Sequence, residues 1–423
     1  MSQIVADGMN DLSISKTSFR VIIIGAGLGG LTLAQSLRRS GIPFTIFERD
    51  SAKHSRPQGY RIKIHGESAA ALRSVLTPEL WQHFVETCGE TVLGESTLNA
   101  VNGSVLSSRK GHADKDVYTV DRSMLRHVLQ QGLSGDGDAK IVWGKEFTEY
   151  KLRENGTVEA YFKDGAKEVA NLLVGADGSR SRTTKLLVPN YSVLDTQGLC
   201  IYGKTFITPQ LQAVLPAPML RWLTISQDHS PVIQSIIHGD VPTSLVVEPM
   251  RFHEKHRQER PEIPNDYLYW TLIINKRFAS PEDVRESSKS AHAAQQFSLD
   301  ITSEWHPSIR ALFQSQDETY TAVVPIFSAR PHIVEWEPDS RVTILGDAVH
   351  LMSPTGGVGA CSAIQDACVL GSKLAKDGLS TQSIGSYERE MRKYAARSLQ
   401  RSLAGGKKLF GQQPFDQCPE VFI

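Results

Sequence analysis

The 423-residue chain lacks the features that would place it in a membrane, on a nucleic acid or in an oxidising compartment. Its 46 basic and 46 acidic side chains cancel, and no long block of one sign occurs, which disfavours nucleic-acid partners. No run of eighteen apolar residues is present, so no integral membrane segment is expected. The five cysteines are scattered and odd in number, which predicts neither a disulfide framework nor a metal site. We therefore expect a cytoplasmic protein.

Glycine, by contrast, is concentrated in three short segments that are far apart in the chain. The first is Gly25–Gly30 (GAGLGG), which follows the apolar run Val21–Ile24 and opens a helical pattern. A short, continuous apolar run is typical of a parallel strand that is buried on both faces. Gly25 allows the tight turn, Gly27 lets the backbone approach a pyrophosphate, and Gly30 lets helix and strand pack closely. The helix N-terminus then offers free N–H groups to the phosphates.

A second short strand pattern supports the same interpretation. Phe44–Phe47 leads into Glu48, which lies 18 residues after Gly30. An acidic residue about 20 residues beyond the glycines is where a ribose hydroxyl is held. The pattern therefore predicts dinucleotide binding, but by itself it does not separate FAD from NAD.

The other two glycine segments also follow predicted strands. Gly175–Ser181 (GADGSRS) comes after a β-meander that contains the hairpin signal Asn155-Gly156. Gly346–Ala360 (GDAVHLMSPTGGVGA) lies between the strand pattern Arg341–Leu345 and the helical pattern Ala360–Leu374. Between these two segments, alternating apolar runs separated by Pro and Gly turns predict a mostly antiparallel sheet.

In this order and spacing, the three segments resemble those of the FAD-dependent monooxygenases of the aromatic-hydroxylase type. These are the class A flavoprotein monooxygenases with the para-hydroxybenzoate hydroxylase fold, and they include fungal enzymes of natural-product (secondary) metabolism. The resemblance covers about residues 18–410. It implies an α/β, Rossmann-like FAD-binding fold with an inserted, mostly antiparallel β-sheet domain for the substrate.

The FAD-binding domain is therefore expected to be discontinuous in the sequence. The expected divisions are a flexible leader (1–17), the N-terminal portion of the FAD-binding domain (18–184), the substrate domain (185–322), the C-terminal portion of the FAD-binding domain with a C-terminal helix (323–410) and a tail (411–423).

The resemblance also implies roles for particular residues. Arg122, in an R-x-x-L setting, is expected to contact the phosphate or ribityl part of FAD, and Asp347 to bond the ribityl hydroxyls. Asp177 and Gly178 are expected at the cleft that flavin and nicotinamide share, although Asp177 would equally cap the following turn. Arg61 is expected beside the flavin or nicotinamide, although it would equally lie on the polar face of a strand. The predicted cofactor-binding residues are Gly25, Gly27, Leu28, Gly30, Glu48, Arg49, Arg61, Arg122, Asp177, Gly178, Asp347, Pro354, Gly357, Gly359 and Ala360.

Two positions depart from the family pattern. Thr184 stands where the family often has an arginine, and Cys361 stands where it usually has an asparagine, two residues past the last glycine of the third segment. One side-chain contact to the flavin ring is therefore expected to be absent or replaced.

The resemblance implies a single-component catalytic cycle. NAD(P)H reduces FAD, O2 adds to the flavin, and the C4a-hydroperoxide delivers one oxygen atom to an aromatic or polycyclic small molecule. Hydroxylation, epoxidation and Baeyer–Villiger insertion all occur in the family, and the sequence does not choose among them. No second glycine motif for NAD(P)H is visible, which also suits this class. The substrate and the oligomeric state stay open.

Candidates for a base that deprotonates a phenol are Tyr202, Lys204 and His238. A lone histidine on an alternating strand is more often structural, and His350, inside the third segment, is expected to be a hydrogen-bonded turn residue. Three alternatives use the same glycine segments. They are a flavin-dependent oxidase or reductase without oxygen insertion, a non-enzymatic flavin-binding protein, and a flavin halogenase, which ranks lower because no Trp-x-Trp-x-Ile pattern occurs.

Overall fold

The short apolar runs form the parallel sheet at the centre of one half of the molecule. The computed structural model describes residues 19–51, 60–112, 117–133, 137, 139–228 and 243–422. The strand order in this sheet is β17-β11-β1-β2-β7, and every neighbouring pair is parallel. The strands are β1 (Val21–Ile24), β2 (Phe44–Phe47), β7 (Ala139–Val142), β11 (Leu172–Gly175) and β17 (Val342–Ile344). The first two coincide with the sequence prediction.

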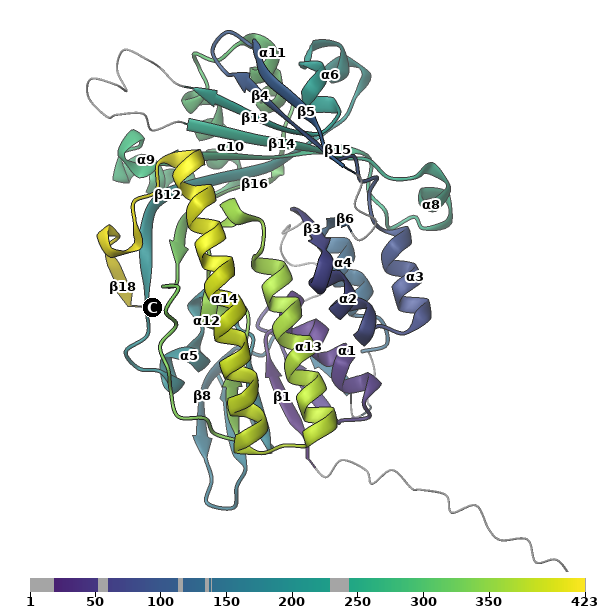
Figure 1. Cartoon of the computed structure of the whole chain (residues 1–423), viewed down its shortest axis with the longest axis vertical. Helices are drawn as coiled ribbons and strands as arrows, with labels where there is room; N and C mark the ends of the chain where they lie inside the picture. Colours follow the sequence, from purple (N-terminus) through teal and green to yellow (C-terminus); the bar gives the residue numbers. More distant parts are fainter. Residues whose placement is uncertain are drawn as a thin grey trace, which may run out of the picture.

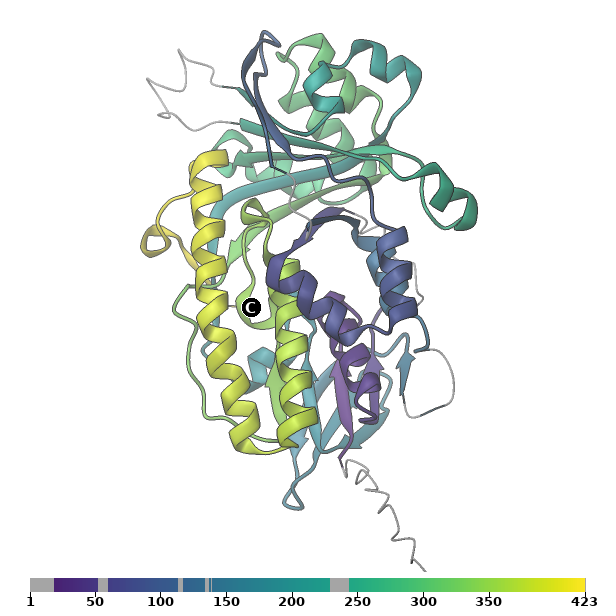
Figure 2. The ribbon, with the colours of Figure 1, turned by 45° about the vertical axis from the view of Figure 1, so that its right-hand side comes forward.

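Helices cover this sheet, and we call the sheet and its helices the FAD half. The two longest helices run side by side along the molecule in both ribbon views (Figures 1 and 2). The helices are α1 (Leu28–Arg39), α2 (Gly66–Val75), α3 (Pro78–Glu86), α4 (Arg122–Leu129), α5 (Arg182–Leu187), α12 (Asp347–His350), α13 (Gly359–Asp377) and α14 (Thr381–Phe410). Their apolar faces and the parallel strands share one continuous core.

Two smaller sheets complete this half. The predicted meander is formed by β8 (Phe147–Leu152), β9 (Val158–Phe162) and β10 (Lys167–Ala170), all antiparallel. Asn155 Oδ1 accepts the Thr157 N–H at 3.2 Å inside the β8–β9 turn, which confirms the hairpin. The strands β3 (Arg61–His65) and β6 (Val117–Asp121) pair antiparallel and lie next to the second half of the molecule (Figure 1).

A larger sheet, which we call the large sheet, forms the other half. Its order is β16-β12-β15-β14-β13-β4-β5, with β18 paired to β12, and the contacts are antiparallel except for β13–β4. The strands are β4 (Gly94–Asn99), β5 (Val105–Lys110), β12 (Ser192–Phe206), β13 (Leu223–Asp228), β14 (Thr243–Met250), β15 (Tyr267–Asn275), β16 (Asp317–Ser328) and β18 (Glu420–Phe422). The helices α6 (Pro209–Val214), α9 (Pro281–Ser287), α10 (Ala291–Ile301) and α11 (Pro307–Gln314) lie beyond the sheet from the FAD half, and α8 (Glu254–Glu259) projects at its edge (Figure 1).

The large sheet draws strands from outside the expected substrate domain, residues 185–322. Residues 94–110, expected in the N-terminal portion of the FAD-binding domain, form β4 and β5, and the expected tail contributes β18. The physical reason is non-local. Leu98 of β4 is fully buried in the core of the large sheet, and Trp222 packs against Gly94. Such pairing depends on partners more than a hundred residues away, which local patterns do not reveal. Among the described residues, no helix is long and apolar enough to cross a membrane.

Candidate active site

The first glycine segment forms the turn between β1 and α1. Gly25 has a φ of +105°, and a Cβ there would lie 2.4 Å from the Ala176 carbonyl oxygen. A Cβ on Gly30 would lie 2.1 Å from the Gly25 carbonyl oxygen. At Gly27, in contrast, no atom lies within 4 Å of a Cβ. Packing therefore requires Gly25 and Gly30, whereas Gly27 faces space that a ligand can occupy.

Glu48, at the end of β2, holds this turn in place. Its Oε2 accepts the Ala26 N–H at 2.7 Å, and its Oε1 accepts the Asp50 N–H at 3.0 Å. Arg126, which the sequence prediction missed, donates from Nη2 to the Ala26 carbonyl at 3.2 Å. Arg126 lies four residues after Arg122 on α4, so helical periodicity could have placed the two arginines on one face.

The third glycine segment forms the loop before α13. Pro354–Gly356 is a 3₁₀ turn, and Gly357 follows with a φ of +62°. A Cβ on Gly356 would lie 2.9 Å from the Ser402 Cα, and Thr355 Oγ1 donates to the Ser402 carbonyl at 2.8 Å. Contact with α14 therefore fixes the path of the loop.

The N-termini of α1 and α13 share an unusual property. Among the α-helices of the described residues, these two have neither a side-chain N-cap nor an acidic residue in the first turn. The first four N–H groups of a helix have no partner within the helix, and they form the positive end of its dipole. Both ends can therefore accept a negatively charged group. FAD carries a pyrophosphate and a ring that becomes anionic on reduction, so the bare N-termini and the space at Gly27 fit this cofactor.

Asp347, the second residue of the third segment, begins α12. Its side chain is exposed, yet the surrounding protein raises its pKa, while the charges of His350 and Arg122 act to lower it. The Arg122 charge therefore acts on the Asp347 carboxylate, the other residue to which the resemblance gives a FAD contact.

A buried network supports the turn that carries Asp347. Asp366 Oδ2 accepts the Gly346 N–H at 2.7 Å and lies 2.7 Å from His350 Nε2. Asp366 Oδ1 accepts the Tyr394 hydroxyl at 2.5 Å. Burial acts most strongly and would lower the pKa of His350, but the Asp366 carboxylate, the charge of Asp347 and a backbone hydrogen bond together raise it. His350 is thus a hydrogen-bonded turn residue, as expected.

The second glycine segment is stabilised by its own aspartate. Asp177 accepts the Ser181 hydroxyl at 2.6 Å and the Thr183 N–H at 3.1 Å, and burial raises its pKa. This is the turn-capping arrangement that the sequence left open. Thr184, the first departure from the family pattern, donates from Oγ1 to the Ala348 carbonyl at 2.7 Å. It therefore links the second segment to the third.

Aromatic rings from both halves meet beside Arg122. The Arg122 guanidinium lies 5.2 Å from the centre of the Tyr60 ring, and the Tyr60 and Tyr202 rings meet edge to face at 6.1 Å. Burial raises the pKa of Tyr202 to about 12, and the charge of Arg122 acts to lower it. Arg122 therefore contributes to the electrostatics of both Asp347 and Tyr202.

Lys204 is held in a buried ion pair. Its Nζ lies 2.8 Å from Asp121 Oδ2, and both side chains are almost fully buried. Asp121 also accepts the Tyr267 hydroxyl at 2.7 Å and the Ser123 N–H at 2.7 Å, and so it caps α4. The sequence prediction missed Asp121, although an aspartate immediately before a helical pattern is an N-cap signal.

A second ion cluster joins β3 to β14. Glu248 Oε1 lies 2.5 Å from Arg61 Nη2 and 2.7 Å from Lys63 Nζ, and Arg61 and Glu248 are almost fully buried. Burial lowers the pKa of both cations, and the Glu248 carboxylate opposes that shift. The alternation of the β3 side chains thus directs Arg61 and Lys63 toward the large sheet.

Comparison with known proteins agrees with this geometry. Residues 18–273 and 274–402 match the sequence family described as FAD binding domain. The chain belongs to this family. It is 40% identical over 439 residues to a dual O-methyltransferase/FAD-dependent monooxygenase of Phaeosphaeria nodorum, covering 94% of this chain and 46% of that protein. A dual enzyme of the same description from Cercospora beticola is 41% identical over 421 residues, covering 96% and 48%. This chain thus spans about half the length of these relatives.

Solved structures show the same fold. A crystal structure of a candidate FAD-containing monooxygenase from Photorhabdus luminescens is 29% identical, covers 93% of this chain and 99% of that chain, and has a TM-score of 0.77. The α/β FAD-binding fold with a second sheet, expected from the sequence, is therefore confirmed for this FAD-binding protein.

Four other residues that were predicted to bind the cofactor lie at the start of a helix or on the surface of this FAD-binding protein. Leu28 is the buried first residue of α1, and Arg49 is exposed just after Glu48. Gly359 and Ala360 are the first two residues of α13. His238 lies outside the described residues.

Proposed function

We propose that this protein is a FAD-dependent monooxygenase that uses NAD(P)H and O2 to insert one oxygen atom into an aromatic or polycyclic small molecule. The observation that carries the proposal is the pair of bare helix N-termini at α1 and α13, each reached through a glycine turn. FAD, when bound, supplies the redox and oxygen chemistry. The chain's own residues bind and orient the cofactor and the substrate.

The first and third glycine segments supply the FAD contacts in this proposal. Gly27 and the N-terminus of α1 hold the pyrophosphate, and Glu48 holds a ribose hydroxyl. Asp347 bonds the ribityl hydroxyls, and the α13 N-terminus directs its N–H groups to the ring. Arg122, whose charge acts on Asp347, contributes the positive charge that a phosphate or the anionic reduced ring attracts.

The substrate lies in this proposal between the FAD half and the large sheet, where Tyr60, Tyr202 and Arg122 meet. Tyrosine rings stack on aromatic ligands, and a hydroxyl on each ring adds a polar contact. Tyr202 keeps its proton at neutral pH because its pKa is about 12, so it acts as a hydrogen-bond donor to the substrate. Lys204 is paired with Asp121, and we therefore assign it a positioning role.

The charges at this junction favour a substrate with an ionisable hydroxyl. Two carboxylates face three buried or half-buried cations, namely Asp121 and Glu248 against Arg61, Lys63 and Lys204. A surplus of positive charge stabilises a nearby phenolate. The fungal relatives join an O-methyltransferase to the monooxygenase in one chain. O-methylation needs a hydroxyl acceptor, which supports a phenol or its methyl ether as the substrate.

The test is NADPH and NADH oxidation by the FAD-loaded protein with a panel of phenolic and polycyclic compounds under ¹⁸O2. Substrate-stimulated oxidation, with one labelled oxygen atom in the product, is the expected result. If the flavin is reduced and every compound yields only peroxide, either the panel lacks the substrate or the protein is an oxidase. If neither nicotinamide reduces the flavin, the proposal is wrong.

A matched pair of variants ties the activity to the site. Asp347→Asn removes the proposed ribityl contact, and FAD affinity should fall by about tenfold, as for the loss of one hydrogen bond to a charged group. Asp164→Asn is the control, because Asp164 lies in the exposed β9–β10 turn and pairs with Lys145. It should leave the FAD affinity unchanged.

A further inference from the structure

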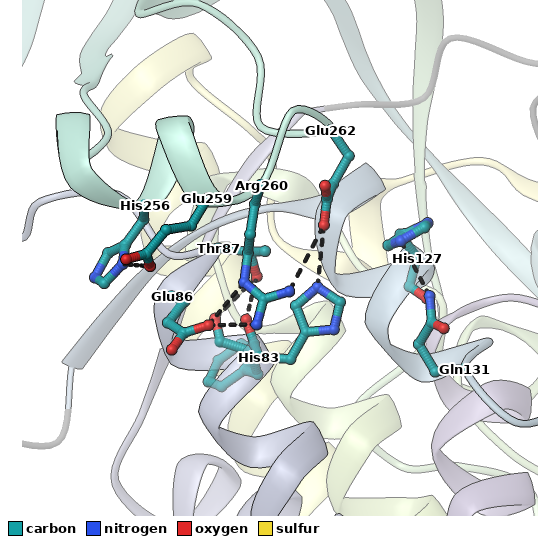
Figure 3. Close-up of polar contacts among 10 residues, drawn as sticks. His83, Glu86, Thr87, His127, Gln131, His256, Glu259, Arg260 and Glu262 are labelled. Atoms are coloured by element: carbon teal, nitrogen blue, oxygen red, sulfur yellow. Dashed lines mark hydrogen bonds and ion pairs between the residues drawn. The ribbon is translucent and has the colours of Figure 1, made fainter.

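Two histidines and a glutamate from three separate segments meet where the FAD half adjoins the large sheet (Figure 3). His83 lies on α3, His127 on α4, and Glu262 in the connection between α8 and β15. One ligating atom from each residue lies within 4.8 Å of the other two. We propose that these side chains bind a divalent first-row metal ion, with Zn²⁺ the best match to two imidazoles and a carboxylate.

The spacing of the ligating atoms suits a tetrahedral ion. Zinc bonds of about 2.0–2.2 Å place neighbouring ligand atoms about 3.4 Å apart. His83 Nε2 and Glu262 Oε1 are 3.3 Å apart, so one edge of the tetrahedron already has this length. A side-chain movement of at most about 1.4 Å brings the His127 ligating atom from the 4.8 Å limit to the 3.4 Å edge of the tetrahedron. Three protein ligands leave the fourth position to water.

The nearest cation is occupied by another carboxylate. Arg260 donates from both Nε, at 2.7 Å, and Nη2 to Glu86 Oε2. Its Nη1 lies 3.9 Å from Glu262 Oε1, beyond hydrogen-bond distance. Figure 3 shows the Glu262 carboxylate in contact with His83 and in a longer ion pair with Arg260, with the His127 ring on the other side of it. Because Arg260 is bound more closely by Glu86, a metal ion would compete only with this longer ion pair for the Glu262 carboxylate.

One neighbouring side chain orients the third ligand. The Gln131 amide nitrogen lies 3.0 Å from His127 Nε2 and 3.3 Å from the His127 carbonyl oxygen. In this geometry the Gln131 amide donates and His127 Nε2 accepts. A metal-bound His127 would donate from its second ring nitrogen instead, which requires the Gln131 amide to turn so that its oxygen accepts. We therefore treat Gln131 as a positioning residue of the site.

A metal ion at this position would stabilise the fold, because its ligands come from two regions of the chain. α3 and α4 belong to the FAD half, whereas Glu262 is carried by the segment that leads into β15 of the large sheet. A bound ion would join these two regions of the chain beside the substrate region. Because such a site is not formed in the unfolded chain, the metal stabilises the folded form.

The experiment uses the FAD-loaded full chain, freed of metal with a chelator and then titrated with Co²⁺ and with Zn²⁺. Co²⁺ is followed by its visible absorption, and Zn²⁺ by competition with a chromophoric chelator. We expect one Co²⁺ per chain, displaced by Zn²⁺, with a rise in the melting temperature. His83→Gln, His127→Gln and Glu262→Gln should each weaken binding by about 100-fold or more, and Gln131→Met by about tenfold.

His253→Asn is the matched control, because His253 is exposed immediately before α8 and lies 3.7 Å from Glu90. It should bind metal like the parent, and unchanged FAD content shows that each variant is folded. Absence of one-to-one binding in the parent would overturn the proposal. Equal binding by the parent and all three ligand variants would overturn it as well. The assay measures no turnover, so its outcome is independent of the proposed monooxygenase activity.

Discussion

The glycine loops and the junction with the large sheet differ in whether a protein side chain caps the helix N-termini. In the glycine loops of the FAD half, α1 and α13 begin without any side chain on their first N–H groups. At the junction with the large sheet, α4 begins under Asp121, which accepts the N–H groups of Ser123 and Met124. At α1 and α13, no side chain accepts the first N–H groups, which leaves them for a ligand. At α4, which lies at the junction of the two sheets, a side chain of the protein accepts them.

This difference separates the residues that serve the cofactor from those that serve the fold. At the bare helix starts, a substitution should change ligand affinity more than stability, unless the new atom meets the backbone. At the junction, Asp121, Lys204 and Tyr267 satisfy one another, so a substitution there should change stability first.

The largest effect is expected within the first glycine turn. Gly30→Ala would place a Cβ 2.1 Å from the Gly25 carbonyl oxygen, so the variant should lose several kcal/mol of stability, more than the ~1–3 kcal/mol of ordinary overpacking. Gly27→Ala meets no atom, so the FAD-free protein should melt like the parent. Its FAD affinity should nevertheless fall by about tenfold or more, a cost of about 1.4 kcal/mol.

Both variants are checked by the melting temperature of the FAD-free protein and by FAD titration. If the Gly27→Ala protein binds FAD as tightly as the parent, Gly27 does not serve the ligand. If the Gly30→Ala protein has the melting temperature of the parent, packing does not require Gly30.

The next effect concerns the junction. Lys204→Met leaves the Asp121 carboxylate buried without its cation, which should cost about 3–5 kcal/mol of unfolding free energy. The double variant Lys204→Met/Asp121→Asn removes both charges and should recover some of that loss. Chemical denaturation of four proteins, the parent, Lys204→Met, Asp121→Asn and the double variant, measures this difference. If the double variant is as unstable as the sum of the two single variants, the two side chains do not act as a pair.

A smaller effect is expected at Tyr202. Tyr202→Phe removes the hydroxyl that we propose donates to the substrate, and turnover should fall by about tenfold to a hundredfold, equivalent to a hydrogen bond to a charged group. Because burial raises the pKa of Tyr202 to about 12, its ionisation should not shape the rate below about pH 10. The pH profiles of parent and variant should therefore run parallel. A rise in rate near pH 8 that vanishes in the variant would identify Tyr202 as an ionised base instead.

The smallest effect is a pH dependence at His350. The native structure raises the pKa of His350, so the protonated ring stabilises the fold. The difference in unfolding free energy between the parent and His350→Gln should be largest below about pH 6.5 and decline as the pH rises through the raised pKa. His292→Gln is the control, because His292 and its partner Glu318 are both exposed. A difference that grows with pH would contradict this account of the Asp366 network.

The FAD half was largely predictable because its signals are local. Val21–Ile24, Phe44–Phe47 and Glu48 follow one another within one short stretch, and each glycine has an effect on its immediate neighbours. The junction was not predictable in the same way. Lys204 is 83 residues from its partner Asp121, and nothing in the sequence near either residue points to the other.

Two further features show the limit of pattern reading. The alternation in β3 placed Arg61 and Lys63 on one face, but only the fold shows that this face meets Glu248. The sequence prediction of no metal site rested on cysteine spacing. His83, His127 and Glu262 share no short motif, so only their meeting in three dimensions suggests a ligand set.

The way in which the chain passes between its sheets limits how such a protein can change. β4 and β5 join the large sheet before β6 and α4 return to the FAD half, and β18 pairs with β12 after the last helix of the FAD half. Exchange of a single gene segment between two members of the family would leave at least one strand without its neighbour. New substrate preferences should therefore arise through replacement of individual side chains on existing strands, and transplantation of a whole substrate domain should fail.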